Sequence, residues 1–159
     1  MERREKFGTL SDLGIITAPP DFVPVSEFEG GSFPNPSWVI RPGQRIWVRA
    51  HNQVVSGTTT SEERLAFLAS LESYLPSAQG ASLILEQKPE LLPGRQWYGF
   101  FDKREHLWED VESRDFRVPG ILVGGGSFLP DLGFFKRPWN GFYSFLSFCD
   151  EPEHLMGLS

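Results

Sequence analysis

Glycine and proline place the strongest constraint on how this chain can fold. Sixteen glycines and thirteen prolines are spread through its 159 residues, and they interrupt nearly every apolar stretch. Proline is excluded from helix interiors and central strands, and glycine weakens both, so we expect short elements joined by many turns. Apolar residues make up 40% of the chain and charged residues 23%, which is typical of a single folded domain of ordinary size.

The clearest β pattern is the alternation over residues 45–50. It predicts that three apolar side chains share one face of a strand and that Arg45, Trp47 and Arg49 share the other face. Turns are predicted at Pro42-Gly43 and His51-Asn52, and further strands over residues 22–29, 38–41, 82–86, 96–101, 118–123 and 142–148. The last of these strands is expected to close a C-terminal hairpin through the Asn140-Gly141 turn.

Two helices are predicted, over residues 60–75 and 103–113. Thr60 and Glu63 have the spacing of a capping box, and leucines recur every three or four residues after them. Asp102 is placed to cap the second helix. The predicted fold class is therefore α+β, with a mostly antiparallel sheet of hairpins and about two helices packed on one side.

The positions of proline and of charged residues also predict the domain organisation. Residues 1–21, which end in Pro19-Pro20, are expected to form an extended arm or loop. Residues 22–150 form a single α+β domain in this interpretation, and residues 151–159 form an acidic tail.

The net charge bears on which partners the chain can bind. A formal net charge of −6 disfavours nucleic-acid binding and is compatible with a basic protein partner. An alternative explanation is that the charge only keeps the protein soluble. No stretch has the apolar length of a signal peptide or a membrane span, and the single Cys149 favours a reducing compartment. We therefore expect a cytoplasmic protein that does not contact a membrane.

The sequence contains no strong motif for catalysis or for binding a phosphate, a metal or a cofactor. The Gly-Gly-Gly-Ser run at residues 124–127 lacks the lysine and spacing of a phosphate loop and is interpreted as a turn. Cys149 precedes two acidic residues, which do not favour a reactive thiolate. No catalytic residue, metal ligand set or cofactor is predicted. If the chain were an enzyme, His51, Asp102 and His106 would be the first residues to test.

Three groups of residues are candidates for binding a partner. The first is the acidic and aromatic group on the predicted second helix, namely Glu105, Trp108, Glu109, Asp110 and Glu112. The second is Trp139, which either anchors a contact from an exposed loop or folds back onto the sheet. The third is the face formed by Arg45, Trp47 and Arg49, which is either a binding hot spot or a surface covered by a helix.

These observations support three hypotheses of different classes. The first is a non-catalytic intracellular protein-binding protein, such as an inhibitor or a toxin-immunity protein, whose partner is a basic protein. The second is a structural subunit of a phage or other assembly, laced to its neighbours by the N-terminal arm. The third is a small enzyme or a ligand-binding β-rich domain with an apolar pocket.

Overall fold

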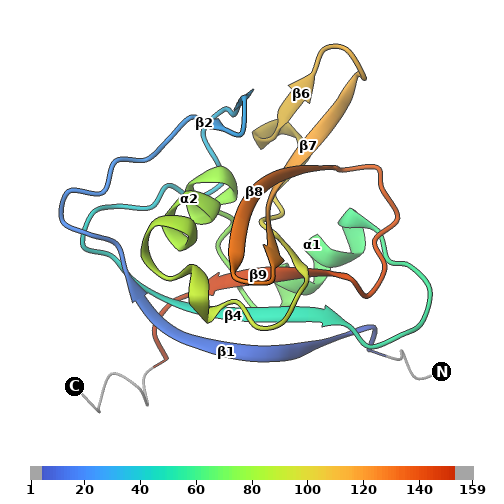
Figure 1. Cartoon of the computed structure of the whole chain (residues 1–159), viewed down its shortest axis with the longest axis horizontal. Helices are drawn as coiled ribbons and strands as arrows, with labels where there is room; N and C mark the ends of the chain where they lie inside the picture. The colour runs from blue at the N-terminus through green and yellow to red at the C-terminus, as the bar shows by residue number, and fades with distance from the viewer. Residues whose placement is uncertain (1–4, 153–159) are drawn as a thin grey trace.

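A seven-stranded sheet organises the chain and confirms the α+β class (Figure 1). The computed structural model describes residues 5–152. The order of strands is β1-β4-β9-β5-β7-β6, with β8 paired to β7, and β2 and β3 form a separate small sheet. The strands are β1 (Phe7–Thr17), β2 (Glu27–Phe28), β3 (Gly31–Ser32), β4 (Arg45–Gln53), β5 (Trp97–Gly99), β6 (Trp108–Asp110), β7 (Asp115–Gly124), β8 (Ser127–Phe134) and β9 (Tyr143–Cys149).

Strand β1 lies where an N-terminal arm was expected. It pairs antiparallel with β4 from Phe7 opposite Gln53 to Thr17 opposite Arg45, with two register shifts. Its buried apolar side chains dock it against the core, so residues 7–17 belong to the sheet. Strand β4 runs through the predicted turn at His51-Asn52 because His51 is buried and hydrogen-bonded within the sheet. Of the predicted acidic tail, residues 153–159 lie outside the described residues.

Helix α1 (Ser61–Ser70) has the predicted capping box. The Thr60 side chain accepts from the backbone N–H of Glu63, and the Glu63 carboxylate accepts from the backbone N–H of Thr60. The helix ends five residues earlier than predicted. Glu72 takes a positive φ of 57°, and Tyr74 then joins the sheet by donating its backbone N–H to Phe148.

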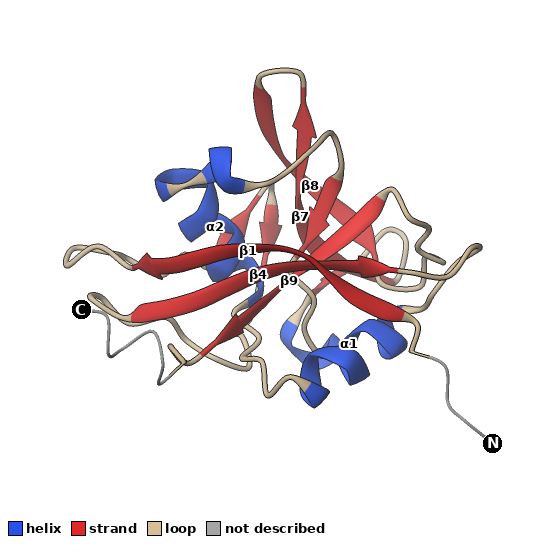
Figure 2. Ribbon diagram, turned by 90° about the horizontal axis from the view of Figure 1, so that it is seen from below, coloured by secondary structure: helices blue, strands red, loops and turns tan. Residues whose placement is uncertain are grey.

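Helix α2 (Ser77–Gln87) replaces the strand predicted over residues 82–86. Its small residues allow a close approach to the sheet, since a Cβ on Gly80 would lie 3.0 Å from the Phe148 ring. Phe148 and Phe145 point to opposite faces of β9, and Phe67 of α1 packs on Phe145. The two helices therefore cover opposite faces of the β1-β4-β9 part of the sheet, rather than one side (Figure 2).

The second predicted helix, 103–113, is instead a single 3₁₀ turn (Arg104–His106) followed by β6, which forms a hairpin with β7. The reason lies in Asp102, which does not cap a helix. Its buried carboxylate accepts hydrogen bonds from the backbone N–H and the hydroxyl of Ser37, and so holds the loop before β4.

Several other segments also depart from the predictions. Residues 38–41 are loop, and only Glu27–Phe28 of the segment 22–29 is strand. Strand β9 pairs with β4 and β5, not with β8, so the predicted C-terminal hairpin does not form. The glycine run at 124–126 ends β7 and makes the turn into β8, as interpreted from sequence.

The core is built around stacked tryptophans. The Trp97 and Trp139 rings lie 5.0 Å apart and nearly parallel. Two strand glycines make room for them, because a Cβ on Gly120 would lie 2.2 Å from Trp97 and one on Gly133 would lie 2.7 Å from Trp139. Asp131 accepts a hydrogen bond from the Trp97 indole N–H. The cluster joins β5, β7 and β8 to the segment before β9, which carries Trp139.

Candidate functional site: an acidic end and an aromatic face

Two hairpins lie side by side at one end of the molecule, where Figure 1 shows β6 and β7 rising beyond the body. The β2–β3 hairpin packs against β6, and a Cβ on Gly31 would lie 2.6 Å from the Trp108 ring. Trp108 is therefore half-buried at the base of this end rather than a free anchor. We call this region the acidic end, because it carries five exposed glutamates: Glu27, Glu29, Glu105, Glu109 and Glu112.

The glutamates of the acidic end are available to a partner. Within residues 5–152, none of the five forms an ion pair. Asp110 differs from them, because its carboxylate lies 3.8 Å from the Arg117 guanidinium and accepts from the backbone N–H of Glu112. That contact shapes the β6–β7 turn, whose Val111 is 78% exposed. The turn therefore presents Val111 between the carboxylates of Asp110 and Glu112, with the exposed Arg114 at its end.

Sequence reasoning identified part of this end. Trp108, Glu109, Asp110 and Glu112 lie on the β6–β7 hairpin and not on the predicted α-helix, and Glu105 lies on the 3₁₀ turn just before it. Glu27 and Glu29 were missed, because their proximity depends on packing between distant segments. The Gly30-Gly31 pair was the one local signal, since it marks the tight turn that carries them.

Trp139 does not belong to a binding surface. Its side chain is fully buried, and its indole N–H donates to the hydroxyl of Ser61 at 2.8 Å. Its ring stacks on Trp97. The prediction of an exposed anchor is thus wrong, and Trp139 takes the other role considered from sequence, in which it folds back onto the sheet.

Arg45, Trp47 and Arg49 share one face of β4, as the alternation predicted. All three side chains already have partners within the molecule, although Arg49 Nε makes no hydrogen bond among the described residues. Arg45 forms a two-point ion pair with Glu151, the Trp47 indole N–H donates to Asp12, and the Arg49 guanidinium lies 3.7 Å from the centre of the Trp47 ring. This aromatic face is far from the acidic end in the sheet, since β9, β5 and β7 separate β4 from β6.

A buried serine–histidine pair lies further along the same face of β4. His51 Nε2 is 2.7 Å from the Ser147 hydroxyl, and His51 Nδ1 is 3.2 Å from the hydroxyl of Thr9. Burial, aided by the nearby Arg49 charge, lowers the pKa of His51 to about 4. Both His51 and Ser147 are fully buried, so no substrate reaches them and the pair acts as a structural link between β1, β4 and β9.

Asp102 and His106 also hold structure in place. Burial raises the pKa of the Asp102 carboxyl, against the opposing effect of its hydrogen bonds from Ser37. His106 Nδ1 lies 2.7 Å from the Asn35 carbonyl oxygen. Together these contacts fasten residues 35–37 to the segment before β6. Among residues 5–152, no group of three His, Cys, Asp or Glu side chains has the arrangement of a metal site.

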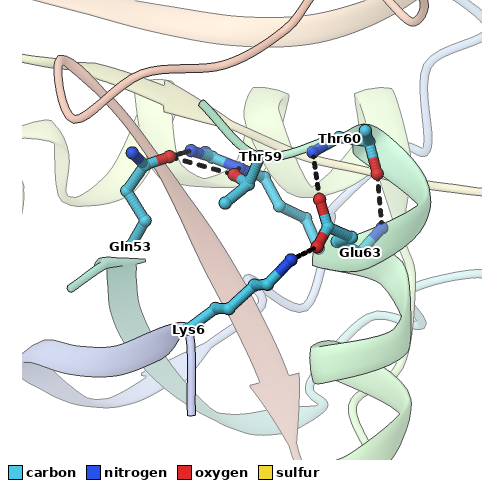
Figure 3. Close-up of polar contacts among 6 residues, drawn as sticks. Lys6, Gln53, Thr59, Thr60 and Glu63 are labelled. Carbon is cyan, nitrogen blue, oxygen red and sulfur yellow. Dashed lines mark hydrogen bonds and ion pairs between the residues drawn. The ribbon is translucent and has the colours of Figure 1, made fainter. Parts of the chain in front are cut away.

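Arg64 is the buried charge that the sequence did not reveal. It lies in α1, is fully buried, and donates to Thr59, Gln53 and the Tyr143 carbonyl oxygen at 2.6–3.1 Å. Figure 3 shows the neighbouring Gln53–Thr59 contact and the capping box, which Lys6 extends by pairing with Glu63. Burial lowers the pKa of Arg64 to about 9. The contacts are internal, so Arg64 positions α1 and is not a ligand site.

Comparison of the chain with protein-family models, with curated proteins and with solved structures gave no match. The functional argument therefore rests on the residues and their geometry. Across residues 5–152, no helix combines the length and the apolar character that crossing a membrane requires.

Proposed function

We propose that this chain is a non-catalytic, intracellular protein-binding protein that engages a basic partner through its acidic end, as an inhibitor or toxin-immunity protein does. The observation that carries the proposal is the gathering of five exposed glutamates without ion pairs, four on two adjoining hairpins and Glu105 on the 3₁₀ turn before β6. Like charges held together in this way repel one another and are best neutralised by cations from outside.

The shape of the acidic end supports the same proposal. A hairpin that rises beyond the body of the molecule fits a concave surface better than a flat one (Figure 1). Val111 supplies an apolar contact at the turn, and the surrounding glutamates supply electrostatic steering, which mainly raises the association rate. The half-buried Trp108 supports the hairpin from below.

The test is retention of protein partners from native lysate by two charge-matched variants. One variant replaces Glu27, Glu29, Glu109 and Glu112 by Gln, and the control replaces four exposed acids elsewhere: Asp21 by Asn, and Glu62, Glu86 and Glu90 by Gln. Both variants raise the net charge by four. We expect wild type and control to retain the same basic protein, and the acidic-end variant to bind it at least about tenfold more weakly. Equal retention by both variants would refute the assignment of this surface.

A further inference from the structure

A second surface, distinct from the acidic end, is an open groove of about 470 Å³ between α1 and the loop before β4. Its walls are mainly apolar and are formed by Trp38, Leu65, Ala69, Tyr74 and Leu75, with Lys103 at the edge. This volume falls within the range of small-molecule sites. We call it the Trp38 groove.

The floor of the Trp38 groove is already ordered. The Trp38 and Tyr74 rings stack with centres 4.3 Å apart and an interplanar angle of 13°. The Trp38 backbone N–H donates to Leu75, and the Tyr74 hydroxyl donates to Asp150 at 2.9 Å. A ligand would therefore meet a preformed aromatic surface and would not have to order these side chains on binding.

The polar groups of the groove differ in what they can offer. The Ser37 hydroxyl donates to Asp102, and the Ser73 hydroxyl donates to the Tyr74 carbonyl oxygen, so both protons are already used. Lys103 is exposed, and within residues 5–152 its ammonium group takes part in no ion pair or side-chain hydrogen bond. The groove thus combines an apolar surface with one free cation.

We propose that the Trp38 groove binds a small amphipathic carboxylate, in which an aliphatic chain or a single ring lies on Trp38 and Leu65 and the carboxylate meets Lys103. The charge of Lys103 selects an anion over a cation of the same shape. A polyanion is disfavoured, because beyond Tyr74 the surface continues into a hollow where the carboxylates of Glu72 and Asp150 outnumber the one cation, Arg49. The ligand is therefore compact and carries a single charge.

Calorimetric titration with three probes of equal chain length tests the proposal: octanoate, octanol and octylammonium. We expect wild type to bind octanoate most tightly and octylammonium most weakly. Lys103→Gln should weaken octanoate binding about fivefold, the size of one solvent-exposed ion pair, and leave octanol binding unchanged. Ala69→Arg, at an exposed position on the groove wall, should block both. Lys88→Gln, an exposed lysine at the end of α2, is the matched control and should bind as wild type does.

Two results would overturn the proposal. One is that octanoate does not bind, or binds Lys103→Gln as tightly as wild type. The other is that sedimentation shows wild type as a dimer and Ala69→Arg as a monomer, which would mean that a second copy covers the groove. The acidic-end variant described above should still bind octanoate, so this site and the proposed protein interface can fail independently.

Discussion

The guanidinium of Arg64 donates to the side-chain oxygen of Gln53 at 3.1 Å, and this contact ties α1 to the end of β4 without any carboxylate. The cation is held instead by hydroxyl, amide and carbonyl oxygens and lies 5.0 Å from the centre of the Phe145 ring. A buried charge with several neutral acceptors depends on the planar shape of the guanidinium, because one compact donor group cannot reach them all.

We therefore predict that Arg64→Lys destabilises the protein nearly as much as Arg64→Met does. Either change leaves acceptors buried without donors, and the expected loss is about 3 kcal/mol in the free energy of unfolding. Urea unfolding followed by circular dichroism measures it. Arg41→Lys, at an exposed position, is the control and should change stability little. A stable Arg64→Lys variant would show that the fork geometry is unimportant.

His51 makes stability fall in mild acid. Its pKa is about 4 in the folded protein, below the value of 6.5 expected when it is unfolded. Between these values the unfolded chain binds more protons, so stability is fully present above pH 6.5 and is lost as the pH falls toward 4. The loss from this group is about 3 kcal/mol.

His51→Gln removes that titration and retains a side chain able to bond Ser147. The free energy of unfolding, measured in urea at pH 7 and pH 4, should fall more in wild type than in the variant, by about the same 3 kcal/mol. Asp102 has the opposite effect, because its raised pKa favours the folded state as the pH falls. Both proteins contain Asp102, so its contribution cancels in the comparison. Parallel pH profiles for the two proteins would contradict the assignment.

Local signals predicted β4 and α1 because alternation and capping act over only a few residues. They failed where distant contacts decide the conformation. The short apolar run at residues 82–86 has no period that separates strand from helix, and the small Gly80 lets this segment pack as a helix against Phe148. Asp102 has the sequence context of a helix cap, but its carboxylate accepts from the backbone N–H of Ser37, which is 65 positions away in the chain.

In the candidate site, too, local features could be predicted and long-range contacts could not. Glu109 and Glu112 are close in the chain, so they lie near each other on the observed hairpin as they would on the predicted helix. Glu27 joins them only because Gly31 packs on Trp108. Trp139 was an open choice in the sequence, since its position depends on stacking with Trp97 from another strand.

Ser77 is a strained position that can be improved. It adopts a φ of 52° while fully buried, and its hydroxyl has no hydrogen-bond partner among the described residues. Ser77→Gly relieves both penalties and should raise the free energy of unfolding by about 1 kcal/mol. Ser77→Ala removes the hydroxyl and keeps the backbone strain. Its free energy of unfolding in urea should therefore lie between the values for wild type and Ser77→Gly. Destabilisation by Ser77→Gly would indicate that the hydroxyl is in fact bonded.

Gly120 sets how closely the sheet can pack on Trp97. A Cβ at this position would lie 2.2 Å from the ring, and Trp97 is itself wedged against Trp139, so neither can move aside. Gly120→Ala should therefore cost about 3 kcal/mol in unfolding free energy through overpacking. Gly141→Ala is the matched control, because a Cβ there meets nothing within 4 Å and its φ is not in the left-handed region. Urea midpoints that fall equally for both variants would mean that lost backbone freedom, and not contact with Trp97, explains why glycine occupies position 120.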